Sequence, residues 1–184
     1  MEKLRVLLAD DHAVLRAGLR MLINSQSDLV VVDEAADAAE AVQKTDTASP
    51  DVVVMDISMP AGGGIRAVES IHRQHPEVRV LVLSMHSDAA YVRSALAAGA
   101  AGYIAKGSAD TELLNGIRCV RSSTRPYLDS TLAGALDAAA PQPAGRGAGR
   151  LSNRERQVLE LLAQGYTNQQ VADRLFLSTA VQDN

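Results

Sequence analysis

Short apolar runs alternate with amphipathic segments over the first 121 residues of the chain. The apolar runs are Leu4–Ala9, Val30–Ala35, Val52–Met55, Val80–Ser84 and Gly102–Ala105. Between them apolar residues recur at three- and four-residue steps, as at Leu15, Leu19 and Leu22, which is typical of helices that bury one face. Continuous Val- and Leu-rich runs indicate strands buried on both faces, as in parallel sheets. We therefore predict a doubly wound, five-stranded parallel α/β domain over residues 1–122.

A different pattern follows this domain. Residues 123–150 combine a short helical stretch, predicted from about Ser130 to Ala139, with the run PQPAGRGAGR. That run is rich in Pro, Gly and Ala and has no periodicity, so it indicates a flexible linker. Residues 151–184 contain two helix-starting capping boxes, SNRE and TNQQ, each followed by apolar residues at helical spacing. They predict a second, small all-α domain.

Composition excludes several protein classes. No apolar run approaches the roughly 18 residues that a membrane-spanning helix needs, so we expect no membrane span. Asp10 and Asp11 interrupt the opening run too early for a signal peptide. The single cysteine, Cys119, excludes an intrachain disulfide and favours a reducing, cytoplasmic setting. Its place in a helical pattern leads us to expect a buried side chain.

Charge is unevenly distributed between the two parts of the chain. Residues 1–140 contain 13 Lys and Arg against 18 Asp and Glu, a net charge of −5, whereas residues 141–184 contain 5 against 4. An acidic first domain suits a cation-binding site. The faintly basic second part gives only weak support for nucleic-acid binding.

Polar side chains stand at the carboxyl ends of four predicted strands. The first strand ends in Asp10 and Asp11, the third in Asp56, the fourth in Ser84 and the fifth in Lys106. Each residue alone fits a helix cap, a turn or a solvated surface position. Because ligands of doubly wound sheets bind beyond the carboxyl ends of the strands, the four ends together predict one functional site.

The chemistry of this predicted site follows from its charge. Three converging carboxylates repel one another unless a cation lies among them. The donors are oxygen atoms, with no nearby set of His or Cys, which favours a hard ion such as Mg²⁺. Mg²⁺ also takes phosphate oxygens, so we predict Asp56 as a nucleophile toward a phosphoryl group. Lys106 and Ser84 would then hold the phosphoryl oxygens by ion pairing and hydrogen bonding.

Four stretches, LLADDH, DVVVMDISMP, VLVLSMH and AGAAGYIAK, resemble in order and spacing the receiver domain of a two-component response regulator. The resemblance covers residues 4–121 and implies a flavodoxin-like fold. It implies Mg²⁺ bound by Asp11, Asp56 and the backbone carbonyl of Ser58, with Asp10 in support. It also implies that a sensor histidine kinase supplies the phosphoryl group to Asp56 from a phosphohistidine.

Ser84 and Tyr103 resemble the switch pair of the same family. In such a pair the hydroxyl moves to the phosphoryl group and the aromatic ring turns inward. The plainer alternative for Tyr103 is a packing tyrosine that is partly buried.

The stretch from Leu151 to Ser178 resembles the LuxR-type helix-turn-helix domain of NarL/FixJ-type regulators, in which the following helix reads the major groove. The resemblance implies promoter DNA as a partner, with DNA contacts from Thr167, Asn168, Gln169, Ser178 and Thr179. The final letters, LSTAVQDN, leave room for only about one turn of that helix, which is unstable alone. We therefore expect a domain incomplete at its C-terminus, and a chain that reads DNA poorly although an intact parent would bind promoter DNA.

These observations predict a cytoplasmic response regulator in which phosphorylation of Asp56 switches a DNA-binding output domain. The resemblance also suggests a homodimer that forms on phosphorylation. We expect no enzyme acting on other molecules, only a switch that assists its own phosphotransfer and dephosphorylation. One alternative is a receiver that acts through protein contacts alone, with a tail that does not bind DNA.

Two further alternatives are enzymes. A phosphatase with an Asp nucleophile would usually carry a second Asp two residues later, where this sequence has Ser58. A dinucleotide-binding fold is disfavoured because no G-x-G-x-x-G follows the first apolar run.

Overall fold

The computed structural model describes residues 3–59 and 63–132. They belong to the first of two units into which the chain divides, Met1–Ala140 and Pro141–Asn184. The predicted linker run and the predicted helix-turn-helix domain lie outside the described residues. So do the five predicted DNA-contacting residues, Thr167, Asn168, Gln169, Ser178 and Thr179.

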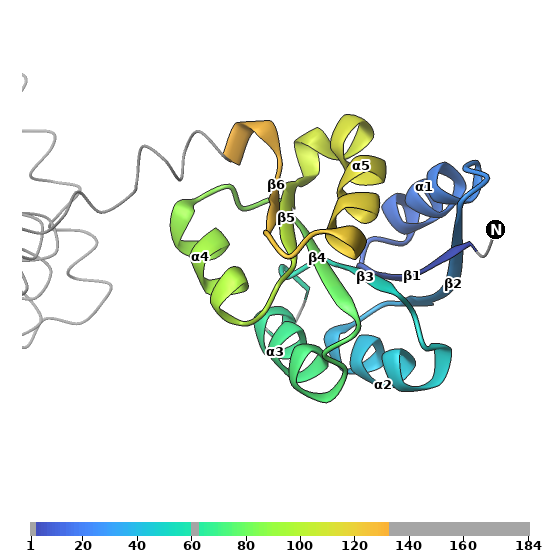
Figure 1. Cartoon of the computed structure of the whole chain (residues 1–184), viewed down its shortest axis with the longest axis horizontal. Coiled ribbons are helices and arrows are strands. Elements are labelled where there is room, and N and C mark those ends of the chain that lie inside the picture. The colour runs from blue at the N-terminus through green and yellow to red at the C-terminus, as the bar shows by residue number, and fades with distance from the viewer. Residues whose placement is uncertain (1–2, 60–62, 133–184) are drawn as a thin grey trace, which may run out of the picture. The chain divides into compact units, whose positions relative to one another are not determined.

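A single parallel sheet forms the centre of the described unit (Figure 1). Its strands are β1 (Leu4–Ala9), β2 (Leu29–Ala35), β3 (Val52–Met55), β4 (Arg79–Ser84), β5 (Gly102–Ala105) and β6 (Tyr127–Leu128). They lie in the order β2-β1-β3-β4-β5-β6, and each pairs in parallel with its neighbours. The reversal of strand order at β1 and β3 confirms the doubly wound topology. Because the strands are parallel, the carboxyl ends of β1, β3, β4 and β5 lie at one edge.

The sheet has six strands, so the prediction of five was wrong by one. The sixth, β6, has only two residues, which pair with Gly102 and Tyr103 of β5. A two-residue strand is too short to show a periodic pattern in the sequence. Its approach depends on Gly102, because a Cβ there would lie 2.7 Å from the carbonyl oxygen of Tyr127. A helix begins directly afterwards at Ser130, as predicted, and beyond Leu132 it leaves the described residues.

Helices cover both faces of the sheet. One face carries α1 (Ala13–Asn24) and α5 (Ala109–Ser122), and the other carries α2 (Ala38–Ala48), α3 (Gly64–Gln74) and α4 (Ala89–Ala97) (Figure 1). Two aliphatic clusters result, one on each face, because the strands bury side chains of both faces. Within residues 3–59 and 63–132, no helix has the length and apolar character that crossing a bilayer requires.

Helix α2 shows how local sequence sets an element boundary. The carboxylate of Asp37 accepts a hydrogen bond from the backbone N–H of Glu40 at 2.8 Å, and the Glu40 carboxylate accepts one from the N–H of Ala36 at 2.7 Å. The letters DAAE thus form a variant of the capping box, in which the Glu40 side chain bonds the amide before the N-cap residue. The helix ends at Ser49, whose φ of 43° is left-handed and stops the helix before β3.

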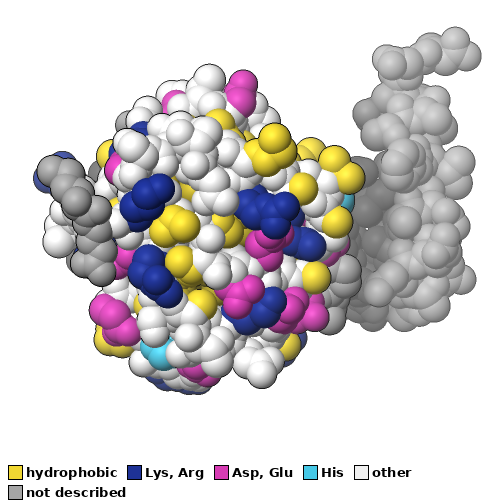
Figure 2. Space-filling model, turned by 90° about the vertical axis from the view of Figure 1, so that its right-hand side faces the viewer, with side chains coloured by type: hydrophobic (Ala, Val, Ile, Leu, Met, Phe, Trp, Pro, Cys, Tyr) yellow, Lys and Arg dark blue, Asp and Glu magenta, His cyan; other side chains and the backbone are white. Residues whose placement is uncertain are grey.

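The β2 side of the unit carries charges of both signs. Figure 2, which views the molecule from this side, shows Lys and Arg next to Asp and Glu. Glu34 pairs with Arg16 at 3.0 Å and with Arg20 at 2.9 Å, and Lys44 pairs with Glu40 at 2.8 Å. The charges contributed here by β2, α1 and α2 therefore largely neutralise one another.

Cys119 is exposed, so the expectation of a buried thiol was wrong. Helix α5 buries Leu113, Ile117 and Val120 against the sheet. Residues spaced by three and four positions share a helix face, and Cys119 lies one position before the last of them, on the outer side.

Candidate functional site

The predicted acidic residues meet at the carboxyl end of the sheet. Asp10 and Asp11 follow β1, and Asp56 follows β3. One ligand atom from each of these residues, and one from His12, lie within 4.8 Å of one another. Parallel strands present their carboxyl ends at one edge, so the convergence follows from the topology.

Lys106, directly after β5, joins this cluster. Its Nζ lies 2.6 Å from Oδ2 of Asp56 and 2.7 Å from Oδ2 of Asp10. The side chains are 7% exposed for Lys106, 4% for Asp10 and 1% for Asp56. Burial alone would lower the pKa of Lys106, but the two carboxylates outweigh it and hold that pKa above its ordinary value. The lysine is therefore a firmly charged partner of both aspartates.

The cluster nevertheless keeps an excess of negative charge, with three carboxylates to one lysine. Oδ2 of Asp10 has only the ion-pair contact with Lys106, and Oδ1 of Asp11 is also buried; neither accepts a hydrogen bond of good geometry. Buried carboxylate oxygens that lack a well-formed hydrogen bond are costly. Close oxygen donors with uncompensated charge suit a small divalent cation such as Mg²⁺. The residues present thus fit the predicted ion.

Ser58 lies at the same rim. Its backbone N–H donates to Oδ1 of Asp56 at 2.7 Å, which orients the carboxylate. Both oxygens of Asp56 are thereby occupied, one by Ser58 and the other by Lys106. Gly64 permits this loop to pack closely, because a Cβ at that position would lie 2.4 Å from Cα of Ile57.

His12 also belongs to the cluster, as a single histidine among the three aspartates. Its Nδ1 is 3.0 Å from Oδ1 of Asp11 and 3.2 Å from Oδ1 of Asp10. The ring is 66% exposed. The signal was present in the sequence, because His12 directly follows Asp11 in LLADDH.

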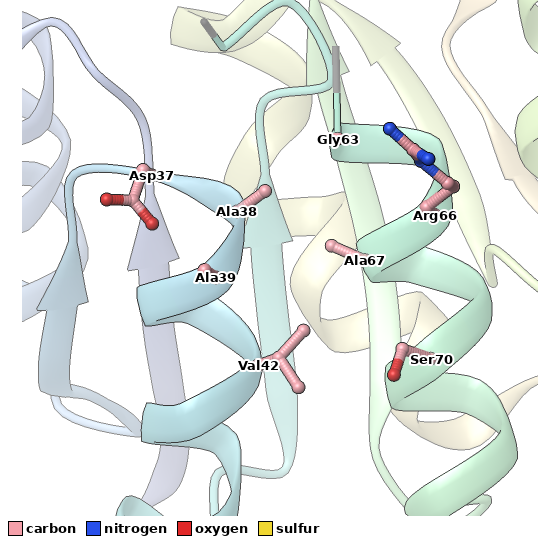
Figure 3. Close-up of a pocket in the computed structure, with 8 residues that line it drawn as sticks. All are labelled: Asp37, Ala38, Ala39, Val42, Gly63, Arg66, Ala67 and Ser70. Atoms are coloured by element: carbon pink, nitrogen blue, oxygen red, sulfur yellow. The ribbon is translucent and has the colours of Figure 1, made fainter. Parts of the chain in front are cut away.

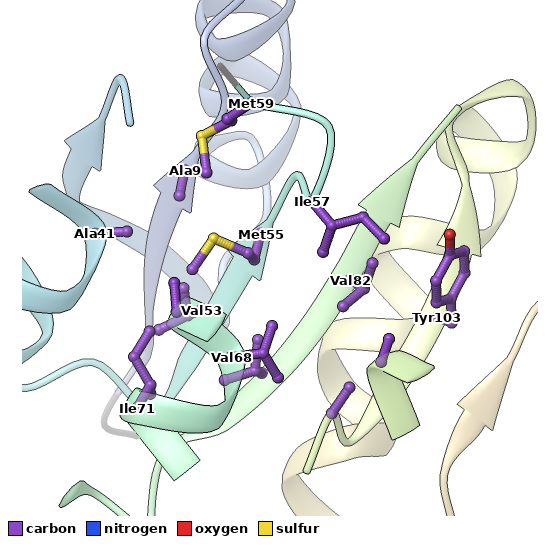
Figure 4. Close-up of a cluster of buried hydrophobic side chains, with 14 of the residues drawn as sticks. Ala9, Ala41, Val53, Met55, Ile57, Met59, Val68, Ile71, Val82 and Tyr103 are labelled. Atoms are coloured by element: carbon purple, nitrogen blue, oxygen red, sulfur yellow. The ribbon is translucent and has the colours of Figure 1, made fainter. Parts of the chain in front are cut away.

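Ser84 is the last residue of β4, and Tyr103 lies within the neighbouring strand β5. The hydroxyl of Ser84 is buried, lies 3.2 Å from the hydroxyl of Ser58 and accepts the N–H of His86 at 3.2 Å. Tyr103 is fully buried in the cluster shown in Figure 4, and its hydroxyl donates to the carbonyl of His86 at 2.7 Å. Burial raises the pKa of Tyr103. The β4–α4 loop thus contacts both residues of the predicted switch pair.

A hollow of about 620 Å³ lies elsewhere, between α2 and α3 (Figure 3). Ala38, Val42 and Ala67 face its interior, and Asp37 and Arg66 lie near its mouth. None of its lining residues belongs to the acidic cluster. The candidate site is therefore identified by its charge and burial, and this hollow is separate from it.

Comparisons with known proteins agree with this geometry. Residues 6–118 match the response regulator receiver domain, and residues 149–180 match the LuxR family of bacterial regulatory proteins. The oxygen regulatory protein NreC of Staphylococcus carnosus is 39% identical over 184 residues, which cover 95% of this chain and 84% of that protein. NreC of Staphylococcus haemolyticus is 38% identical over 187 residues, with the same coverage.

Solved structures give the same picture. A LuxR-family two-component response regulator from Aurantimonas sp. shares 36% identity with a TM-score of 0.71, covering 75% of this chain and 98% of that one. A structure of two RcsB dimers bound to two parallel DNAs shares 25% identity with a TM-score of 0.70, covering 95% of this chain and 83% of that one.

Proposed function

Since this chain belongs to the two-component response regulators that carry a LuxR-type DNA-binding domain, we propose that transfer of a phosphoryl group to Asp56 sets its regulatory state. One observation carries the proposal. Asp56 is a buried carboxylate at the end of β3, held by the N–H of Ser58 and the ammonium of Lys106 beside two further aspartates. The two matched domains favour this function over a phosphatase and over a receiver that acts through protein contacts alone.

The transfer step needs few participants. A carboxylate oxygen of Asp56 forms a bond to phosphorus while the bond from phosphorus to the donor's histidine nitrogen breaks, and the electron pair leaves on the imidazole. Lys106 contacts Asp56 at 2.6 Å, close enough to pair with an oxygen of the arriving phosphoryl group. Ser84, next to Ser58, supplies a hydroxyl donor to another oxygen.

Asp11, Asp56 and the backbone carbonyl of Ser58 would hold Mg²⁺ at this rim, with Asp10 in support. When bound, the ion neutralises charge on the transferring oxygens. Asp10 also keeps Lys106 in place through its 2.7 Å ion pair, so it supports the site from two sides.

Ser84 and Tyr103 form the proposed switch. A hydrogen bond from Ser84 to the phosphoryl group would draw the β4–α4 loop toward Asp56. Tyr103 would follow because its hydroxyl is bound to the carbonyl of His86 in the same loop. Movement of the β4–α4 loop would then alter the surface of α4, as in other switches in which an added phosphoryl charge reorders a segment.

The partners follow from the family. A sensor histidine kinase supplies the phosphoryl group, promoter DNA is the target of the LuxR-type domain, and phosphorylation favours a homodimer. The RcsB structure, in which dimers bind DNA, supports the last two points by analogy. We place the protein in the cytoplasm and infer that it also assists its own dephosphorylation.

The direct test is incubation with acetyl phosphate and Mg²⁺ followed by intact-mass measurement. The parent chain should gain one phosphoryl group and Asp56→Asn should gain none. Asp51→Asn is the matched control, since Asp51 lies just before the opposite end of the same strand. A gain that persists in Asp56→Asn would reject Asp56 as the acceptor.

A further inference from the structure

Asp129 is a fully buried carboxylate outside the acidic cluster. It follows β6, in the stretch YLDS near the C-terminal end of the described residues. A charge removed from water this completely requires strong partners. Its two oxygens meet that requirement in different parts of the fold.

Oδ1 caps the helix that begins at Ser130. It accepts hydrogen bonds from the backbone N–H of Thr131 at 2.9 Å and of Leu132 at 3.0 Å, and from the hydroxyl of Thr131. This arrangement is an ordinary helix N-cap. A cap alone needs only one oxygen and does not require full burial.

Oδ2 faces the other way and accepts a hydrogen bond from the backbone N–H of Ala105 at 2.6 Å. Ala105 is the last residue of β5, and the next residue is Lys106. The N–H of Asp129 additionally donates to the carbonyl of Tyr103 at 3.3 Å. Asp129 therefore holds the strand end from which the Lys106 side chain extends.

The chain on either side of Asp129 is tied to the same region. Tyr127 and Ser130 both hydrogen-bond the carboxylate of Glu112 in α5. Leu132 is buried in the cluster that contains Tyr103, and Leu128 packs against that cluster. The segment Tyr127–Leu132 is thus packed against the strand that carries the proposed switch tyrosine and phosphate-binding lysine.

We propose that Asp129 is a positioning residue of the phosphoryl-transfer site, which holds Lys106 through the Ala105 amide while capping the segment that leads out of the receiver. The inference rests on the proposed function, because Lys106 matters through its place beside Asp56. One rigid carboxylate then links the lysine at the site to the first turn of the helix that begins at Ser130. A movement of Lys106 on phosphorylation is transmitted to Thr131 and Leu132.

The test compares Asp129→Ser with Asp37→Ser. Serine preserves a capping oxygen but offers no second acceptor to Ala105. Asp37 is a matched control because it caps α2 through Glu40 and has no contact with Lys106. With acetyl phosphate and saturating Mg²⁺, Asp129→Ser should become phosphorylated about tenfold more slowly than the parent. This loss of rate is smaller than the roughly 100-fold loss that a 1 Å displacement causes, because Lys106 should move by less than that. Asp37→Ser should match the parent.

A second measurement needs no phosphate. A double-mutant cycle in urea unfolding should show that Asp129→Ser and Lys106→Ala are coupled, whereas Asp37→Ser and Lys106→Ala are additive. If Asp129→Ser does not fold, the isosteric Asp129→Asn takes its place in both experiments. If Asp129→Ser is phosphorylated at the parent's rate and its effect on stability is additive with that of Lys106→Ala, the proposal is overturned. Asp129 would then be only a helix cap. A parent chain that takes up no phosphoryl group would instead contradict the proposed function. The double-mutant cycle would still test whether Asp129 is coupled to Lys106.

Discussion

The two ends of the sheet carry similar charged side chains in opposite arrangements. At the amino end Arg118 pairs with Asp28 at 2.8 Å, and the two side chains are 37% and 52% exposed. At the carboxyl end Lys106 forms ion pairs with two buried aspartates, Asp10 and Asp56, and Asp11 adds a third carboxylate. Charge is matched and hydrated at one end, and crowded and buried at the other.

This difference distinguishes charged residues that form ordinary surface ion pairs from charged residues that form a functional site. An exposed pair contributes little to stability and tolerates change. A buried cluster with uncompensated charge is costly to fold and persists where a ligand completes it. The contrast between the two ends is therefore the physical argument for a cation and a phosphoryl group at the carboxyl end.

The largest expected effect comes from removing the lysine. Lys106→Ala leaves the carboxylates of Asp10 and Asp56 buried without their cation, so we expect a loss of about 3–5 kcal/mol in the free energy of unfolding. Urea denaturation in the absence of Mg²⁺ measures it, and added Mg²⁺ should restore part of the loss. Arg118→Ala is the control at the amino end and should have a much smaller effect. Equal losses in the two variants would remove the distinction between the ends.

A smaller effect of opposite sign is expected for Asp11→Asn. At pH 8 without divalent ions, removing one of the three crowded negative charges should raise the free energy of unfolding by about 1 kcal/mol. This is a fraction of the repulsion of ~4 kcal/mol between two unit charges 4 Å apart at an effective dielectric constant of ~20. Asp28→Asn should instead destabilise the fold slightly, because it breaks an ion pair. Thermal unfolding of both variants checks the signs. Destabilisation by Asp11→Asn would show that its charge is already compensated.

The smallest expected effect is on the stability of the fold at acidic pH. The hydrogen bond from Arg118 lowers the pKa of Asp28, so the unfolded chain binds its proton at higher pH than the folded chain does. The contribution to stability is present above the ordinary pKa of about 3.9 and is lost as pH falls through the lower, folded value. Asp28→Asn should therefore show a shallower loss of stability below about pH 4. Parallel curves for parent and variant between pH 3 and pH 6 would contradict this sign.

The main strands and the strand-end residues could be predicted because both depend on local sequence. Continuous apolar runs identify buried strands, and parallel topology then brings Asp10, Asp56 and Lys106 to one edge. The double ion pair of Lys106 could not be predicted, because it depends on side-chain directions that only the packed sheet sets.

Other features were missed because they depend on distant partners. Strand β6 is defined by two residues and by the missing side chain of Gly102. Nothing in the stretch YLDS indicates that Asp129 is buried, because its buried partner is an amide 24 residues away, that of Ala105. His12 was not singled out although it adjoins Asp11, because one histidine does not make a set of nitrogen ligands.

Calorimetric titration with Mg²⁺ tests the central claim most directly. The parent chain and Asp28→Asn should bind one ion with the same affinity, whereas Asp11→Asn should lose most of the binding heat because a carboxylate ligand is gone. Unchanged binding in Asp11→Asn, or no binding in the parent, would contradict a cation site at the carboxyl end of the sheet.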